Sequence, residues 1–234
     1  MRLNIRFKYW LLATTTALVL LLTSLFLATV FGKFTRLAEE NAQQRFSLIT
    51  QYATARIASL IQGVAQLVQI QGSSDPAAFR DGPSINPWGL VSLFMASLEN
   101  HASVYSHYFA LGNDEFVQVI GVRSNGKIIA ALKAPATTHF AVRRIVGTAS
   151  QRSEHWQFFD IQRSLLSERT AEASYLPSTR PWHQGAIKEN RLFVTAPYLF
   201  ASTGEPGLTV SAPLPGGSGV IAADIDLGDL SRFL

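Results

Sequence analysis

Five side chains near the C-terminus could together hold a small molecule that carries opposite charges. They are Tyr175, Arg180, Trp182, Tyr198 and Asp224. An arginine presents a planar fork of donors that suits a carboxylate, whereas an aspartate accepts hydrogen bonds from an ammonium group. The indole of Trp182 can add one donor and an apolar wall, and the tyrosines can orient either end. A cation and an anion that face one cavity predict a site for a zwitterion.

Each of these residues also has a purely structural interpretation. Arg180 and Asp224 could form a structural ion pair, and a tryptophan such as Trp182 is most often a core residue. The joint spacing of the five residues favours a binding site over these alternatives. Asp226 is left out of the site, because it precedes a helix predicted to begin at Leu227 and suits the cap position.

Alternation along residues 219–227 supports the placement of Asp224. Ile221, Ala223, Ile225 and Leu227 form an apolar face of a predicted strand, and Val220, Ala222 and Asp224 form the other face. The carboxylate is therefore expected on the opposite side of the strand from the main apolar face.

No enzymatic chemistry is predicted from the sequence. It contains no phosphate-binding Gly-rich loop, no His-Glu-x-x-His motif and no Gly-x-Ser-x-Gly elbow. It contains no cysteine, and the five histidines lack metal-ligand spacing: His101, His107, His139, His155 and His183. We therefore expect no catalytic residue, metal or cofactor, and a surface position for His101 and His107.

A membrane-spanning segment is predicted near the N-terminus. Residues 11–31 form a run of 21 residues without charge, proline or glycine, and about 20 apolar residues cross a bilayer as a helix. Threonine and serine hydroxyls inside the run can bond back to the preceding turn. A cleaved signal peptide is the alternative, but its apolar region is usually shorter, about 7–15 residues.

The charge distribution orients this segment and excludes one class of partner. Hydrophobic residues make up 47% of the chain and charged residues 15%, well below the roughly 25% typical of globular domains. The net charge is +4, of which residues 1–32 carry +3 on Arg2, Arg6 and Lys8. The positive-inside rule places the N-terminus in the cytoplasm and the rest outside the inner (cell) membrane. Because the remainder carries only +1, no nucleic-acid partner is predicted.

One long helix is predicted to follow the membrane segment over residues 32–71 and to end at the Gly72-Ser73-Ser74-Asp75-Pro76 break. Its apolar stripe has near-heptad spacing and comprises Phe46, Ile49, Ala53, Ile57, Leu60, Val64 and Leu67. The stripe could pack on the protein's own domain, or it could also form the seam of a parallel homodimer.

The remaining sequence predicts an antiparallel sheet with short connections. A helix is expected over residues 90–100, and strands over 104–111, 116–122, 127–132, 140–146, 156–161, 192–200, 208–212 and 219–225. The fold class is therefore α+β. The predicted organisation is a basic leader (1–10), a transmembrane helix (11–31), a stalk helix (32–71) and a C-terminal sensor module (72–234).

The C-terminal motif resembles the Cache family of bacterial extracytoplasmic sensors, specifically the membrane-distal module of double Cache domains. In amino-acid-binding members a Tyr, an Arg-x-Trp, a later Tyr and a later Asp line the pocket. Tyr175, Arg180, Trp182, Tyr198 and Asp224 match this pattern in type and order. His183 stands where the family commonly has an aromatic residue. The resemblance covers roughly residues 34–234 and is sharp only from Tyr175 onward.

The resemblance implies a PAS-like Cache module that binds a small, amino-acid-like ligand for transmembrane signalling. The motif occurs in chemoreceptors, sensor kinases, class III adenylate cyclases and cyclic-dinucleotide phosphohydrolases. One alternative is therefore the sensory head of a truncated cyclase or phosphohydrolase, because a second module and an effector would follow Leu234 in such proteins. Another alternative is a ligand-free anchored domain used for dimerisation.

The predicted topology can be tested with a reporter enzyme that is active only outside the cytoplasm. Fused after Leu234, the reporter should be active, because the charge asymmetry around residues 11–31 places the bulk of the chain outside. The same reporter fused after Trp10 is the control and should be inactive. An inactive Leu234 fusion in membranes that contain the protein would contradict the topology.

Overall fold

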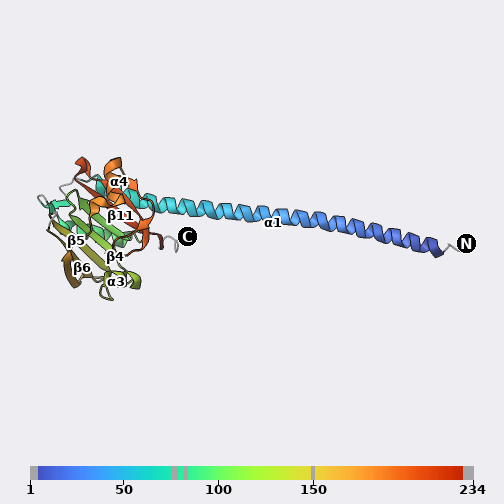
Figure 1. Cartoon of the computed structure of the whole chain (residues 1–234), viewed down its shortest axis with the longest axis horizontal. Coiled ribbons are helices and arrows are strands. Elements are labelled where there is room, and N and C mark those ends of the chain that lie inside the picture. Colours follow the sequence, from blue (N-terminus) through green and yellow to red (C-terminus); the bar gives the residue numbers. More distant parts are fainter. Residues whose placement is uncertain (1–4, 75–78, 82–83, 149–150, 229–234) are drawn as a thin grey trace. The chain divides into compact units, whose positions relative to one another are not determined.

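A computed structural model describes residues 5–74, 79–81, 84–148 and 151–228 (Figure 1). The chain divides into two compact units, Met1–Ala55 and Arg56–Leu234. Helix α1 (Ile5–Gly72) begins in the first unit and ends in the second. It ends where the sequence predicts a break, although Asp75 and Pro76 themselves lie outside the described residues.

The first unit is an uninterrupted stretch of α1 whose described side chains are solvent-exposed apart from Ala53. One window of 18 residues has a mean hydropathy of 2.2, so the helix is long and apolar enough to cross a membrane by length and composition. As expected, threonine hydroxyls donate to carbonyls of the preceding turn, for example Thr15 Oγ1 to Leu11 O at 2.9 Å. These bonds satisfy the hydroxyls within the helix itself.

The second unit is built on one sheet that contains nine strands within the described residues. Its order is β7-β6-β5-β4-β3-β11-β10-β8, with β9 also paired to β10, and every pairing is antiparallel. The strands are β3 (Ser106–Leu111), β4 (Phe116–Gly121), β5 (Phe140–Thr148), β6 (Gln151–Phe159), β7 (Leu165–Glu172), β8 (Phe193–Val194), β9 (Tyr198–Leu199), β10 (Pro206–Pro213) and β11 (Gly219–Asp226). A separate pair joins β1 (Arg80–Asp81) to β2 (Ser84–Ile85). The predicted α+β class is confirmed.

Helices cover the two faces of this sheet differently. The end of α1 and helix α2 (Pro87–Asn100) pack on one face through residues such as Val64, Val68, Leu90 and Phe94. Helices α3 (Gly126–Leu132) and α4 (Pro181–Glu189) form two smaller apolar clusters with the other face. The residues of β11 divide between the faces as predicted, with Ile221, Ala223 and Ile225 in the first core and Val220 and Ala222 against α4.

Three strand predictions differ from the structure. Residues 126–132 form helix α3, because the Asn125 side chain accepts a hydrogen bond from Lys127 N and caps a helix there. The predicted strand 192–200 is divided into β8 and β9 around Pro197, which has no amide hydrogen for the ladder. Strand β7 was not predicted, because as a largely exposed strand at the sheet edge it lacks apolar alternation.

The surface position predicted for His107 is wrong. His101 is exposed, but His107 lies on β3 between Val119 and Ala223 of the neighbouring strands and is fully buried. Its ring stacks on Phe94 with centroids 4.2 Å apart. Burial, followed by the nearby His101, lowers the pKa of His107 to about 3, so the ring is neutral and behaves as a core aromatic residue.

The apolar stripe of the predicted stalk has two different environments. Leu60, Val64 and Leu67 pack in or against the core of the sheet unit, as the interpretation of a helix packed on its own domain predicts. Phe46 and Ile49 are 71% and 64% exposed in the first unit. The structure therefore accounts for the C-terminal part of the stripe only.

Arg123 forms hydrogen bonds to the end of α2 and to the loop that precedes β3. Its guanidinium donates to the carbonyl oxygens of Leu98 and Ala102, both at 2.8 Å, and of Val104 at 3.0 Å. These carbonyls belong to the last turn of α2 and to the loop that leads into β3, where a helix leaves its own acceptors unpaired.

We expect Arg123→Met to lower the free energy of unfolding by about 1–3 kcal/mol, because several carbonyls lose their donor. Denaturation of the full chain in detergent, followed by tryptophan fluorescence, measures the change. Arg191→Met is the control, since the Arg191 side chain is 74% exposed, and it should cost less than about 0.5 kcal/mol. Equal stability of the two variants would contradict this role.

Candidate functional site

Two rows of side chains place polar groups in the middle of the sheet face that carries α3 and α4. Cross-strand pairing aligns Thr209 with Asp224 and Asp224 with Ser106. The adjacent row aligns Tyr108 with Gln118, and Gln118 with Arg143. These six residues alternate along their strands with residues such as Val117, Val119, Val210 and Ala223, which belong to the opposite core. Strand periodicity therefore gathers the six residues on one face.

The Asp224 carboxylate is the centre of the first row, and only 3% of the residue is exposed. Its oxygens accept hydrogen bonds from Ser106 Oγ at 2.7 Å, from the Tyr108 hydroxyl at 2.6 Å, and from Thr209 Oγ1. Burial raises the pKa of Asp224 to about 6, while the hydroxyl donors and Arg180 oppose that shift. Asp224 is therefore largely ionised at neutral pH but titrates close to it.

A chain of hydroxyls extends this network to β9. Because Thr209 Oγ1 gives its hydrogen to Asp224, the Tyr198 hydroxyl must donate to Thr209 Oγ1, 2.6 Å away. Burial also raises the pKa values of Tyr108, Tyr175 and Tyr198, so these phenols remain protonated donors.

Arg180 lies at the N-terminal boundary of α4, where the sequence fixes the backbone. It precedes Pro181, which favours the extended conformation that Arg180 adopts and which suits the first helical position. Its guanidinium carbon lies 5.9 Å from the ring centroid of Tyr175 and 5.5 Å from that of Tyr198. Its Nε atom is buried and has no hydrogen-bond acceptor among the described residues.

Trp182 fixes α4 on the sheet. It is 1% exposed and meets the ring of Tyr108 edge-on, with centroids 4.9 Å apart. Its carbonyl accepts a hydrogen bond from Ser211 Oγ at 2.9 Å, and its side chain is hydrogen-bonded to Tyr175. His183 packs edge-on against the same indole and is also buried.

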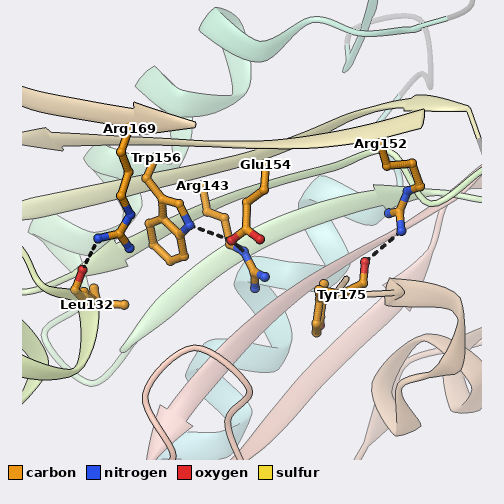
Figure 2. Close-up of polar contacts among 7 residues, drawn as sticks. All are labelled: Leu132, Arg143, Arg152, Glu154, Trp156, Arg169 and Tyr175. Carbon is orange, nitrogen blue, oxygen red and sulfur yellow. Dashed lines mark hydrogen bonds and ion pairs between the residues drawn. The ribbon is translucent and has the colours of Figure 1, made fainter. Parts of the chain in front are cut away.

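The segment before α4 is held by side chains from the sheet. Arg152 on β6 donates to the carbonyl of Tyr175 at 3.0 Å, and Figure 2 shows this contact. The Asp114 carboxylate in the β3–β4 turn accepts from Ser178 N at 2.7 Å, and Arg152 also donates to the Asp114 carbonyl. These bonds set the position of Tyr175 and of the short helix η2 (Pro177–Thr179) that leads to Arg180.

Arg143 is a further cation of the site that the motif did not reveal. It is 7% exposed, and its Nε donates to Glu154 at 2.7 Å (Figure 2). Its guanidinium carbon lies 4.5 Å from the ring centroid of Tyr175 and 5.3 Å from that of Trp156. The only sequence feature that could have indicated Arg143 as part of the site was the presence of an arginine at an inward-facing strand position.

The structure brings four of the five predicted residues to one hollow. Tyr175, Arg180, Tyr198 and Asp224 line it with Tyr108, Gln118, Arg143 and residues 200–202. Trp182 lies behind Tyr108 and is not part of the lining. No ion pair joins Arg180 to Asp224 in the described part of the chain, so the alternative interpretation of these residues as a structural pair is not observed.

The hollow is small, with a volume of about 10 Å³. A ligand must therefore displace part of the lining. A larger hollow of about 780 Å³ is lined by residues such as Ile85, Asn113, Glu115 and Arg144, and it borders segments outside the described ranges. The smaller hollow is the better candidate site, because buried groups of both charges converge on it.

Comparison with known proteins gives short sequence matches. The chain is 44% identical over 57 residues to the methyl-accepting chemotaxis protein McpB of Bacillus subtilis, which is 24% of this chain and 9% of that protein. It is 32% identical over 107 residues to adenylate cyclase 1 of Rhizobium meliloti, which is 44% of this chain and 16% of that protein. The matches thus span a small part of these relatives. No family model matches the sequence.

A solved structure that the chain matches is the ligand-binding domain of the Pseudomonas aeruginosa amino-acid chemoreceptor PctC in complex with GABA. It has 21% sequence identity and a TM-score of 0.44, and the match covers 82% of this chain and 64% of that domain. The curated relatives are a chemotaxis protein and an adenylate cyclase.

The raised pKa of Asp224 predicts a pH-dependent stability of the ligand-free protein. The folded state binds a proton more tightly than the unfolded state, so this contribution is complete below about pH 4 and is lost as the pH rises through 6. A rise from pH 4 to pH 7 should remove about 3 kcal/mol, and Asp224→Asn should abolish this slope.

Denaturation curves of the full chain between pH 4 and pH 7 measure the effect. Glu189→Gln is the matched control, because Glu189 is an exposed carboxylate, and it should leave the slope unchanged. If the free energy of unfolding depends on pH in the same way for Asp224→Asn and the unmodified protein, Asp224 is not the group responsible for this dependence.

Proposed function

We propose that this protein is a membrane-anchored sensor module that binds a small, amino-acid-like ligand outside the cytoplasm and signals through α1. The observation that carries the proposal is the convergence of Asp224 and Arg180 on one hollow without an ion pair between them. Opposite charges that face one hollow without an ion pair suit a ligand that supplies both counter-charges.

The two ends of such a ligand would be bound by different chemistry. The carboxylate of Asp224 would accept from an ammonium group, with Tyr198 and Tyr108 beside it. Arg180 would donate to a carboxylate, which would also supply an acceptor for its unpartnered Nε. The titration of Asp224 near pH 6 means that the affinity for an amine would decline in more acidic solution.

The route from the site to the membrane would run through the sheet and α1. Leu60, Val64 and Val68 of α1 belong to the core on the opposite side of the sheet from the site. A ligand that rearranges the site could therefore change the packing of this helix. The exposed Phe46 and Ile49 would suit a parallel homodimer through the stalk helix, with the N-terminus in the cytoplasm.

A second candidate is the sensory head of a larger signalling enzyme. The match to adenylate cyclase 1 of Rhizobium meliloti covers 44% of this chain and favours it. The residues of the site would have the same role, and catalysis would belong to a separate effector. Gene sequence beyond the codon for Leu234 would separate this candidate from a module that acts without one.

We expect Arg180→Ala to weaken amino-acid binding by roughly tenfold to a hundredfold, because a charge-assisted contact worth about 1.5–3 kcal/mol is lost. The full chain in detergent is first screened by thermal shift against amino acids and GABA, and the strongest binder is then titrated by calorimetry. Arg191→Ala is the control and should bind like the unmodified protein.

The melting temperature of ligand-free Arg180→Ala should change little, since Arg180 has no ion-pair partner in the described structure. Unchanged affinity in this variant would contradict the assigned role of Arg180. Failure of every amino acid, amine and organic acid to raise the melting temperature would favour the ligand-free dimerisation domain.

A further inference from the structure

We propose that the ligand of this site carries a carboxamide in its side chain, held by Gln118 and Arg143. This inference rests on the proposed function, in which Arg180 and Asp224 take the charged carboxylate and amine. It assigns a separate subsite to the row of side chains that contains Gln118 on β4 and Arg143 on β5. These two residues are directly paired, and both line the hollow.

The hydrogen bonds of Ser106 fix the orientation of the Gln118 amide. The single hydroxyl hydrogen of Ser106 is donated to the Asp224 carboxylate at 2.7 Å. Ser106 Oγ can therefore only accept from Gln118, and the group 3.1 Å away must be the Nε2 amino group. The carbonyl oxygen Oε1 of Gln118 is consequently the atom left over.

This oxygen is an unpaired acceptor inside the site. Gln118 is only 5% exposed, and its Oε1 is buried without a donor among the described residues. A buried acceptor without a partner is unfavourable, so a ligand that brings an N–H group to it gains affinity. A carboxylate or an alkyl side chain has no such hydrogen.

Arg143 supplies the complementary donors beside this acceptor. Its Nε is engaged by Glu154, and its ring contacts with Tyr175 and Trp156 hold the guanidinium plane. No acceptor among the described residues is hydrogen-bonded to its two terminal amino groups. A carbonyl oxygen of the ligand beside Arg143 would accept hydrogen bonds from these amino groups.

The charge balance distinguishes a carboxamide from a carboxylate. Glu154 already neutralises Arg143, and Asp224 adds a further negative charge to the same hollow. A second carboxylate on the ligand would face both acids and the Gln118 oxygen. A carboxamide offers one acceptor to Arg143 and donors to Gln118 without adding charge, so it complements both residues at once.

The test compares amino acids of similar size and shape on the full chain in detergent. We expect calorimetric titration to show that L-glutamine or L-asparagine binds at least about tenfold more tightly than L-glutamate and L-methionine. Gln118→Met keeps the side-chain size and removes the acceptor. It should reduce the preference for the amide over L-methionine to less than about threefold.

A second variant guards against a folding defect in Gln118→Met. The pair Arg143→Met and Glu154→Gln removes the guanidinium donors without leaving a lone buried charge, and it should also weaken amide binding while leaving L-methionine binding within about threefold. Melting temperatures of the ligand-free variants establish that each is folded.

The outcomes separate the two proposals. Equal binding of L-methionine and L-glutamine, with both lost in Arg180→Ala, would overturn the carboxamide subsite and leave the proposed function intact. A preference for L-glutamate would overturn it in the same way. Absence of binding by any amino acid would overturn both.

Discussion

Burial of the Asp224 carboxylate imposes the arrangement of the surrounding sheet. A carboxylate in this position loses its hydration and must be supplied with donors from nearby. Ser106, Tyr108 and Thr209 provide hydroxyl hydrogens from the two strands that flank β11. These residues can reach it only if the antiparallel register aligns them, so the register and the site depend on each other.

Polar residues interrupt the apolar surface on the sheet face that carries α3 and α4, and this interruption creates space for a site. Two apolar clusters lie on this face of the sheet, one with α3 and one with α4. The polar rows lie on the face that both clusters share, and Tyr198 packs against both. Because the helices cover the apolar parts, the polar residues are left to form a hollow rather than a continuous core. The opposite face buries α2 and the end of α1.

The two cations of the hollow are held differently, and this difference suits the different roles that we propose for them. Arg143 is fixed by an ion pair with Glu154 and by aromatic rings on both sides. Arg180 lies at a helix boundary against the rings of two tyrosines and keeps an unpartnered Nε. A fixed guanidinium suits discrimination between ligand side chains, whereas an unpaired one suits the capture of a charged group.

The sequence by itself determined the α+β class, the long apolar helix and the positions of most strands, because these follow from hydrophobic periodicity and turn residues. The spacing of Tyr175, Arg180, Tyr198 and Asp224 also predicted a site, and the structure brings these four residues to one hollow. Only the tertiary structure decided that Arg143 and Gln118 lie beside them, since that depends on register between strands β4 and β5. It also decided that His107 is buried and that residues 126–132 are helical. His107 is buried because it packs against α2, and residues 126–132 are helical because Asn125 caps them. Local periodicity encodes neither outcome.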